Sequence, residues 1–235
     1  MLDAIDMISA ERTRQINQEG FAVGHDKRHF SGELAMAACY YAIPCQVEVS
    51  DKGFRASLYP DVFFPGHWGL DWAKRHSKDR IRQLVVAGAL IVAEIDRLLS
   101  GSSNDKEDAL LLYNATSASI GLIAAEHARQ KEEGGYAAWH DKPHADDELA
   151  MAVCYYAMPR QIEVFEKGFR ASIYPEMFFP VEWDLNGTKR HDKDRIEQLV
   201  IAGVFVTAAI DRLLTEKSRE EPLCVSYHAP CGEKL

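Results

Sequence analysis

The sequence predicts a mainly α-helical protein made of two tandem three-helix repeats, each with a short β-hairpin, packed as a pseudo-two-fold internal dimer. Three observations support this expectation. Residues 8–99 align with residues 123–214 without a gap, and roughly 55 of these 92 positions are identical. Apolar residues recur at helical spacing within each copy. The run from Leu84 to Ala93 is apolar on nearly all sides, so it needs more cover than its own copy supplies.

The repeat defines the domain boundaries. We expect a first repeat at residues 1–100, a linker at 101–107, a second repeat at 108–216 and a flexible tail at 217–235. The linker is predicted from its Gly, Ser and Asn content, which is typical of turns. An ungapped match of this length means that both copies adopt one fold.

Within the first repeat, helices are predicted over residues 3–18, 32–43 and 78–99. A glycine follows the first helix and a proline follows the second, and both residue types end helices. Alternating apolar residues on both sides of the Ser-Asp-Lys-Gly tetrad at 50–53 predict the hairpin. Gly88 and its counterpart Gly203 lie in the middle of a helix, where they permit a close approach of another helix.

The composition excludes several classes of protein. A chain of 235 residues with 47% hydrophobic content can bury a core, as an ordinary soluble protein does. A formal charge of -9 argues against binding to duplex nucleic acid. The longest apolar run is too short for a membrane span and no signal peptide is evident, so we expect a cytoplasmic protein without membrane contact. Five cysteines are too few for a disulfide framework.

A cluster of ionisable residues precedes the second helix of each repeat. Its members are His25, Asp26, His29 and Glu33, which recur as His140, Asp141, His144 and Glu148. These residue types can bind zinc, manganese or iron. However, Gly32 and the capping Ser31 start the helix after the histidines, so the side chains do not stack on one helical face. We therefore expect no cofactor and a hydrogen-bonding or anion-contacting role, with a divalent metal as the alternative.

A polar triplet in the first helix is retained in both repeats although its neighbours differ. Its members are Glu11, Arg14 and Gln15 in the first repeat and Glu126, Arg129 and Gln130 in the second. Spacings of three and four residues place each triplet on one face of a helix. The triplet is either part of a ligand site or a solvated face with one weak ion pair.

Basic residues gather just before the third helix of each repeat. The candidates are Lys74 and Arg75, followed by Asp79, and Lys189 and Arg190, followed by Asp194. Cations at this end oppose the helix dipole unless an anion lies among them. Backbone N–H groups at a helix N-terminus bind phosphate, and arginine adds bidentate contacts. We expect phosphate binding here, and the alternative is a solvated basic linker.

Aromatic side chains beside an arginine complete the set of candidates. They are Tyr40, Arg55 and Trp68 in the first repeat and Tyr155, Arg170 and Trp183 in the second. Rings and guanidinium planes stack on nucleobases. Because most rings of a short domain complete its core, we expect only one or two in each repeat to face a ligand.

Taken together, the motifs resemble a group of small helical proteins encoded by phages and prophages. The resemblance covers nearly all of each copy except the hairpin. It rests on Glu11-Arg12-x-Arg14-Gln15, on His25-Asp26-x-x-His29-x-x-Gly32-Glu33-Leu34-Ala35, and on the run from Asp79 to Leu98. The resemblance implies a phage protein that acts in the cytoplasm of an infected bacterium. The second copy departs from the pattern at His127, Gly134, Asp147 and Ala209.

The resemblance and the candidate residues favour a counter-defence sponge, which binds a phosphate-containing immune signalling nucleotide without turnover and so has no catalytic residue. The first alternative is a MazG-like all-α nucleoside triphosphate pyrophosphatase. The glutamate pattern of that family is absent, and magnesium prefers oxygen ligands to histidines. The second alternative is an acidic inhibitor that binds a host protein. We expect a small nucleotide partner, whether cyclic, linear or ADP-ribose-derived, and further homo-oligomerisation stays open.

Overall fold

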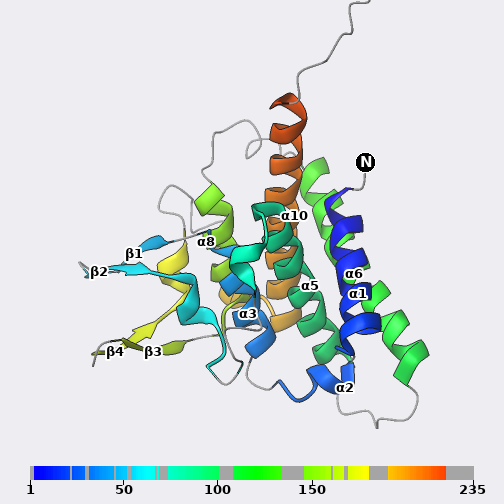
Figure 1. Cartoon of the computed structure of the whole chain (residues 1–235), viewed down its shortest axis with the longest axis horizontal. Coiled ribbons are helices and arrows are strands. Elements are labelled where there is room, and N and C mark those ends of the chain that lie inside the picture. Colours follow the sequence, from blue (N-terminus) through cyan, green and yellow to red (C-terminus); the bar gives the residue numbers. More distant parts are fainter. Residues whose placement is uncertain are drawn as a thin grey trace, which may run out of the picture.

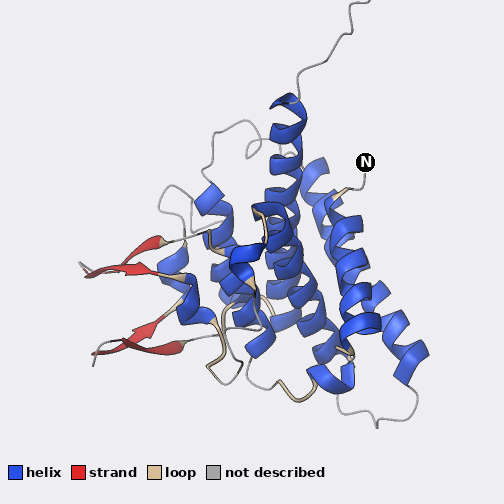
Figure 2. Cartoon of the chain, viewed as in Figure 1, coloured by secondary structure: helices blue, strands red, loops and turns tan. Residues whose placement is uncertain are grey.

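The computed structural model describes residues 3–21, 23–29, 32–44, 46–51, 54–66, 68, 74–100, 108–133, 146–159, 161–166, 169–179 and 190–220. This part of the chain contains seven α-helices and two hairpins, so the prediction of a mainly α-helical protein is confirmed. The helices form a bundle, and both hairpins project from the same side of it (Figures 1 and 2). The predicted linker lies outside the described residues.

Capping residues set the bounds of the first-repeat helices. Helix α1 spans Ala4–Glu19 and ends where Gly20 adopts a left-handed φ of 73°. Helix α2 is one turn, Val23–Asp26, and helix α3 spans Glu33–Ala42. Helix α5 spans Arg80–Leu99. These bounds lie within two residues of the three helices predicted from the sequence.

The second repeat has matching elements. Helix α6 spans Asp108–Glu132, α8 spans Asp146–Ala157 and α10 spans Arg195–Glu220. Helix α10 therefore continues past residue 216, where we had placed the end of the repeat, because its last turns keep helix-forming residues. Residues 221–235 of the predicted tail lie outside the described residues.

Both predicted hairpins are present as antiparallel strand pairs. Strand β1 (Val47–Asp51) pairs with β2 (Phe54–Leu58), and β3 (Ile162–Glu166) pairs with β4 (Phe169–Ile173). Short 3₁₀ turns complete the described elements: η1 (Pro60–Phe63), η2 (Arg75–Ser77), η3 (Pro175–Phe178) and η4 (Arg190–Asp192).

Helices α5 and α10 contact each other in the middle of the bundle (Figure 1). Helix α3 packs on α5 and α8 packs on α10, while α1 and α6 lie on the opposite side. A Cβ added at Gly88 would lie 2.6 Å from Ile8 Cδ1, and one at Gly203 would lie 2.6 Å from Ile123 Cδ1. Each glycine therefore allows the first helix of its repeat to pack closely on the third, as its position in the sequence predicts.

One described helical segment, Arg195–Arg219, is long and apolar enough to cross a membrane by length and composition alone. Of its most apolar window, 61% is buried inside the protein. A buried core helix of a folded domain meets the same length and composition criteria, so this segment is weak evidence for a membrane span.

Candidate functional site

A buried network of charged groups joins helices α1, α2 and α5. The Arg12 side chain is 0% exposed, and its Nη2 donates to Asp26 Oδ2 at 2.6 Å. Its Nε and Nη2 also donate to Asp96 Oδ2, both at 3.3 Å, and its Nη1 donates to the carbonyl oxygen of Phe21 at 3.0 Å. A buried ion pair is tolerated when its remaining hydrogen-bonding groups are satisfied. All three guanidinium nitrogens of Arg12 are engaged, so the network holds α2 against α1 and α5.

The second repeat supplies two further members of this network. On helix α6, Thr116 Oγ1 donates to Asp96 Oδ2 at 2.8 Å, and Ser119 Oγ donates to Asp96 Oδ1 at 2.6 Å. At the repeat offset, these residues correspond to Met1 and Ala4, which have no hydroxyl group. The first repeat therefore cannot supply the same two hydrogen bonds in return.

The burial of this network changes the acidity of its carboxyl groups. Loss of hydration raises the pKa of Asp26, and the positive charge and hydrogen bond of Arg12 oppose that rise. Burial likewise raises the pKa of Asp96, against the hydrogen bond from Ser119 and the charge of Arg12. Each carboxylate therefore depends on its partners to stay ionised in the interior.

A cavity of about 270 Å³ lies beside the network, and we name it the inner cavity. Arg12, Gln15 and Asp26 form its polar side. Four rings and three aliphatic side chains form the rest of its lining: Phe21, His25, His29, Trp68, Leu34, Leu90 and Ala93. The rings follow one another in contact, with centroid distances of 4.8 Å from Phe21 to His25, 4.9 Å from His25 to His29 and 4.6 Å from His29 to Trp68. The planes of Phe21 and His25 are inclined by 27°, and the next two contacts are tilted by 56° and 66°, so the rings together form an apolar wall of the cavity.

The two histidines of the inner cavity have different partners. His29 Nδ1 lies 3.0 Å from Glu33 Oε2. His25 Nδ1 lies 3.5 Å from Asp26 Oδ1 and has no hydrogen-bond partner among the described residues, although the atom is buried. Burial lowers the pKa of His25, the negative charge of the nearby Asp26 opposes this effect, and the positive charge of His29 adds to it. This shift favours the neutral form of His25.

The predicted cluster of His25, Asp26, His29 and Glu33 thus comes together, but as two separate pairs. Within the described ranges, no group of three or more His, Cys, Asp or Glu side chains is arranged to hold a metal ion. Asp26 faces Arg12, and Glu33 faces His29. The arrangement is suited to hydrogen bonding rather than to coordination of an ion by the whole cluster.

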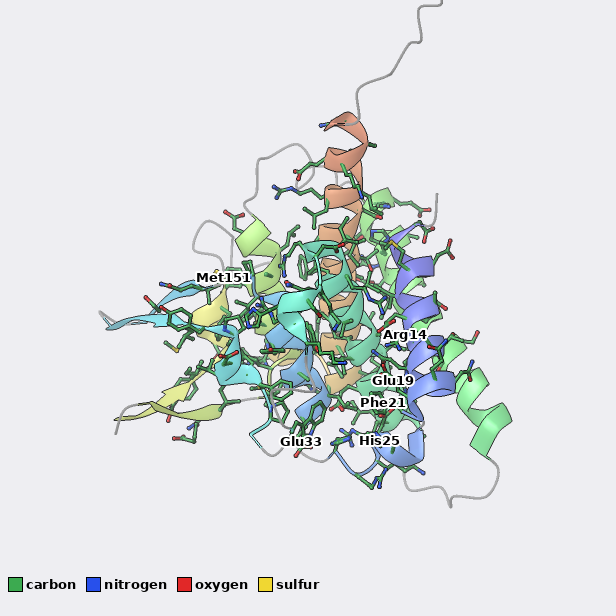
Figure 3. The ribbon with its side chains drawn as sticks, viewed as in Figure 1. Arg14, Glu19, Phe21, His25, Glu33 and Met151 are labelled. Atoms are coloured by element: carbon green, nitrogen blue, oxygen red, sulfur yellow. The ribbon has the colours of Figure 1, made fainter. Side chains whose placement is uncertain are left out.

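A second cavity of about 590 Å³ adjoins the first, and we name it the outer cavity. The two share Gln15, Phe21, Trp68 and Leu90. The outer cavity adds three cationic and two anionic side chains to its described lining: Arg14, Lys74, Lys78, Glu11 and Glu19. Figure 3 shows Arg14 and Glu19 near the lower end of α1, with Phe21 and His25 just below them. The two cavities are therefore adjacent, and both contact these four shared side chains.

Glu11 lines the outer cavity and accepts hydrogen bonds from two arginines. Arg14 donates to its two carboxylate oxygens at 2.8 and 2.9 Å, and Arg82 Nη2 donates to Oε2 at 2.5 Å. Gln15 Nε2 lies 3.4 Å from Oε1. Burial raises the pKa of Glu11, but the hydrogen bonds and charges of Arg14 and Arg82 outweigh it, and the net pKa is lowered. The predicted triplet lies on one helical face, as expected, and lines the cavity.

The same triplet in the second repeat is more open. Arg129 donates to the Glu126 carboxylate at 2.8 and 2.7 Å, and Gln130 Nε2 donates to it at 2.8 Å. The position that corresponds to Arg82 is Glu197, so the second arginine is absent. The Arg129 side chain is 51% exposed. Here the solvated ion pair, which was the alternative interpretation, describes the triplet better.

The phosphate contact predicted for Arg75 does not fit its position and is corrected. Arg75 is buried, and its Nε donates to the carbonyl oxygen of Tyr40 at 3.0 Å. Its Nη2 donates to the carbonyl oxygens of Ile43 and Pro44. These carbonyls belong to the last turn of α3 and the residues after it, where intrahelical partners are lacking. Arg75 therefore caps a helix and does not enter either cavity.

Its counterpart Arg190 also binds a carbonyl group beyond a helix end, but it lines a cavity as well. Arg190 is buried, and its Nη2 donates at 3.1 Å to the carbonyl oxygen of Met158, just after α8. It lines a third cavity, of about 720 Å³, with His191, Lys193 and Glu176, whose Oε1 lies 3.7 Å from Arg190 Nη1. Phosphate binding by Arg190 therefore stays a prediction. Of the basic segment predicted to bind phosphate, Lys74 remains as an exposed cation at the outer cavity.

Four further candidates have structural roles. Tyr40 and Tyr155 are buried and pack on Phe64 and Phe179 in the core, with centroid distances of 4.8 and 5.1 Å. Asp79 accepts from the backbone N–H of Arg82 at 2.8 Å, and Asp194 accepts from that of Glu197 at 2.8 Å. Aspartates in these positions cap the N-termini of α5 and α10.

Several predicted residues cannot be placed. His140, Asp141, His144, Trp183 and Lys189 lie outside the described residues, as do the side chains of Arg55 and Arg170. Glu148 is described and partly buried in the first turn of α8. The predicted second-repeat site is therefore only partly visible.

Sequence reasoning missed the residues at the centre of the first-repeat site. Arg12 differs from its counterpart His127, so it is not among the residues that the two copies share. Asp96 is retained as Asp211 and could have been found by that same comparison. Thr116 and Ser119 precede the aligned part of the second repeat, so the repeat carries no signal for them.

Comparison with known proteins finds no matching family model, no matching curated protein and no matching solved structure. The function must therefore be inferred from the site itself.

Proposed function

We propose that the first repeat binds a phosphate-containing nucleotide and holds it intact, as a phage-encoded sponge for an immune signal does. The observation that carries this proposal is that a ring-lined inner cavity adjoins a cation-edged outer cavity. Gln15, Phe21, Trp68 and Leu90 line both, and we propose that one ligand spans the two. A nucleotide has the matching division into a flat base and an anionic tail.

The charges of the two cavities determine which cavity holds the base of the nucleotide and which holds its phosphates. All three guanidinium nitrogens of Arg12 already donate to protein oxygens, and Asp26 brings a negative charge to the inner cavity. A phosphate there would meet a carboxylate and no uncommitted cation. The inner cavity therefore takes the base, and the phosphates extend into the outer cavity.

Crowding of cations supports phosphate binding in the outer cavity. Lys78 Nζ lies 3.2 Å from the carbonyl oxygen of Lys74 and 6.0 Å from the centre of the Tyr41 ring. Burial lowers the pKa of Lys78, the positive charges of Arg82 and Arg14 lower it further, and the carboxylates of Glu11 and Glu19 partly oppose this. A bound phosphate would add a further anion and so favour the charged form of each neighbouring cation.

The internal dimer remains part of this proposal. Its support is the contact of α5 with α10, together with a ring contact between Phe63 and Phe178 at 5.4 Å. In this arrangement the second repeat supports the first, because α6 supplies the hydroxyls that bind Asp96. We therefore place the nucleotide site in the first repeat.

The carboxylates of the site favour binding over magnesium-dependent turnover. Glu11 is held by two arginines, while Asp26 and Asp96 share Arg12. A MazG-like pyrophosphatase needs several carboxylate oxygens that point together at the metal. The alternatives of a pyrophosphatase and of a protein-binding inhibitor are separated from the sponge by the following experiment.

The purified full-length chain is incubated with a panel of cyclic, linear and ADP-ribose-derived nucleotides, with and without Mg²⁺ or Mn²⁺. After washing, the protein is heat-denatured and the released compounds are separated by chromatography. We expect release of an intact nucleotide. Release of pyrophosphate and monophosphate only when metal is present would replace the sponge with an enzyme. Retention of no nucleotide would overturn the proposal and favour a protein partner.

A matched pair of variants locates the site. The double variant Lys74→Ala and Lys78→Ala should weaken binding of the retained nucleotide by about tenfold or more, because two cationic contacts to phosphate are lost. Lys193→Ala, at the position corresponding to Lys78, should leave the affinity unchanged. Equal losses in both proteins would place the site elsewhere.

A further inference from the structure

We propose that two hydroxyl side chains of the second repeat, Thr116 and Ser119, position the inner cavity of the first repeat, so that the ligand site is incomplete without helix α6. This inference rests on the proposed function and adds a dependence of that site on the other repeat. The observation behind it is a series of hydrogen bonds that leads from α6 through Asp96 and Arg12 to the lining of the cavity.

The series begins at a buried carboxylate that both repeats contact. The Asp96 side chain is 0% exposed. Thr116 Oγ1 donates to its Oδ2 at 2.8 Å, and Ser119 Oγ donates to its Oδ1 at 2.6 Å. Arg12 Nε and Nη2 donate to the same Oδ2, both at 3.3 Å. Both hydroxyl contacts are shorter than the guanidinium contacts, so α6 fixes the orientation of the carboxylate that Arg12 meets.

Arg12 connects this carboxylate to the turn that forms one wall of the inner cavity. Its Nη2 donates to Asp26 Oδ2 at 2.6 Å, and its Nη1 donates to the carbonyl oxygen of Phe21 at 3.0 Å. Phe21 precedes helix α2, and Asp26 ends it. The side chains that line the cavity include Phe21, His25 and Asp26. A shift of the Arg12 guanidinium would therefore move both ends of α2 and change the shape of the cavity.

The hydroxyls also favour the ionised form of Asp96, which attracts the guanidinium. Burial raises the pKa of Asp96. The hydrogen bonds of Ser119 and Thr116 and the charge of Arg12 oppose that rise. A buried carboxylate that loses a donor pays a larger penalty when it is ionised than when it is neutral. Loss of either hydroxyl would therefore weaken the attraction that holds Arg12 in place.

The hydroxyls act in one direction, from the second repeat to the first. The counterpart of Asp96 is Asp211, whose side chain is 23% exposed and lies 3.7 Å from both His127 and Lys131. The residues of the first repeat that are equivalent to Thr116 and Ser119 carry no hydroxyl group. The positioning role is therefore assigned to the first-repeat cavity alone.

The test compares the binding of two probes, adenosine 5′-diphosphate and pyrophosphate, to the full-length protein. In the proposed arrangement, adenosine diphosphate occupies both cavities, whereas pyrophosphate has no base and occupies only the outer cavity. Ser119→Ala should lower the affinity for adenosine diphosphate by about tenfold and that for pyrophosphate by less than about twofold, because only the inner cavity changes shape. A general loss of folded protein would weaken both probes equally and leave the ratio of the two affinities unchanged.

Matched variants assign the effect to the hydroxyls. Thr116→Val keeps the shape of the side chain and removes its hydroxyl, so it should lower the ratio as Ser119→Ala does. Thr116→Ser keeps the hydroxyl and should retain the wild-type ratio. Ser117→Ala, at an exposed position of the same helix, should also leave the ratio unchanged.

The outcomes separate this inference from the proposed function. Wild-type protein that prefers adenosine diphosphate, with an unaltered ratio in Thr116→Val and Ser119→Ala, would overturn this inference alone. The two Thr116 variants decide the question even if Ser119→Ala does not fold. Wild-type protein that binds adenosine diphosphate no more tightly than pyrophosphate would count against the nucleotide site itself.

Discussion

The first helices of the two repeats, α1 and α6, lie in different electrostatic surroundings. In the first repeat, the fully buried Arg12 bridges Asp26 and Asp96. In the second repeat, its counterpart His127 lies 3.7 Å from Asp211, whose side chain is 23% exposed. The first repeat thus has a buried bridge between two carboxylates where the second has a longer contact between a buried histidine and one partly exposed carboxylate.

A second difference concerns the retained glutamate. Glu11 is 1% exposed and held by two arginines, whereas Glu126 is 20% exposed and held by Arg129 and Gln130. By contrast, the close packing of isoleucine on mid-helix glycine is the same in both repeats. The close helix packing is thus the same in both repeats, whereas the charged groups beside it differ in partners and exposure.

The largest expected difference in stability between the repeats comes from the bridge that Arg12 forms to Asp26 and Asp96. Arg12→Ala should lower the free energy of unfolding by about 3–5 kcal/mol, because it leaves two carboxylates buried without their cation. His127→Ala should cost about 1 kcal/mol, the usual value for a single substitution. Urea unfolding of the two variants measures both costs. Equal costs would show that the bridge does not distinguish the repeats.

Loss of the hydrogen bond that Ser119 of the second repeat donates to Asp96 should have a smaller effect on stability. Ser119→Ala should lower the free energy of unfolding by about 1.5–3 kcal/mol, because Asp96 loses a hydrogen bond to a charged group. The pKa of Asp96 should also rise further, since the Ser119 hydrogen bond opposes the effect of burial. Ser117→Ala removes an exposed hydroxyl from the same helix and should change stability by less than about 0.5 kcal/mol. NMR titration and chemical unfolding provide the two measurements.

Substitution of the retained glutamates, Glu11 and Glu126, should give the smallest difference in stability between the repeats. This difference should depend on pH. The folded-state pKa of Glu11 is lowered below its ordinary value of 4.5, so its contribution to stability is present above that value and is lost as the pH falls through the folded pKa. Glu11→Gln should therefore cost about 1–2 kcal/mol at pH 7 and much less at low pH. Glu126→Gln should cost about 0.5 kcal/mol, because its ion pair is exposed. Unfolding of both variants from pH 7 to pH 3 would reveal any contrary trend.

Local patterns were sufficient to predict much of the fold. Helix bounds follow from capping signals at positions such as Gly20 and Asp79, and the hairpins follow from alternation around a turn tetrad. The shared face of Glu11, Arg14 and Gln15 follows from helical spacing, which is also a local property. These predictions depend on residues that are close together in the sequence.

The partners of the charged residues could not be predicted in the same way. Arg75 was expected to bind phosphate, but its guanidinium reaches carbonyl oxygens more than thirty residues away in the sequence. Arg12 and Asp96 are separated by 84 positions, and Ser119 lies in the other repeat. Which cation meets a ligand and which satisfies a helix end depends on tertiary packing, and a sequence pattern does not contain that information.

We propose that the chain binds one nucleotide, in the first repeat. Native mass spectrometry of the full-length chain, saturated with the nucleotide that it retains, measures the number of nucleotides bound. We expect one nucleotide per chain. Two nucleotides per chain would show that both repeats bind and that the site is not confined to the first repeat.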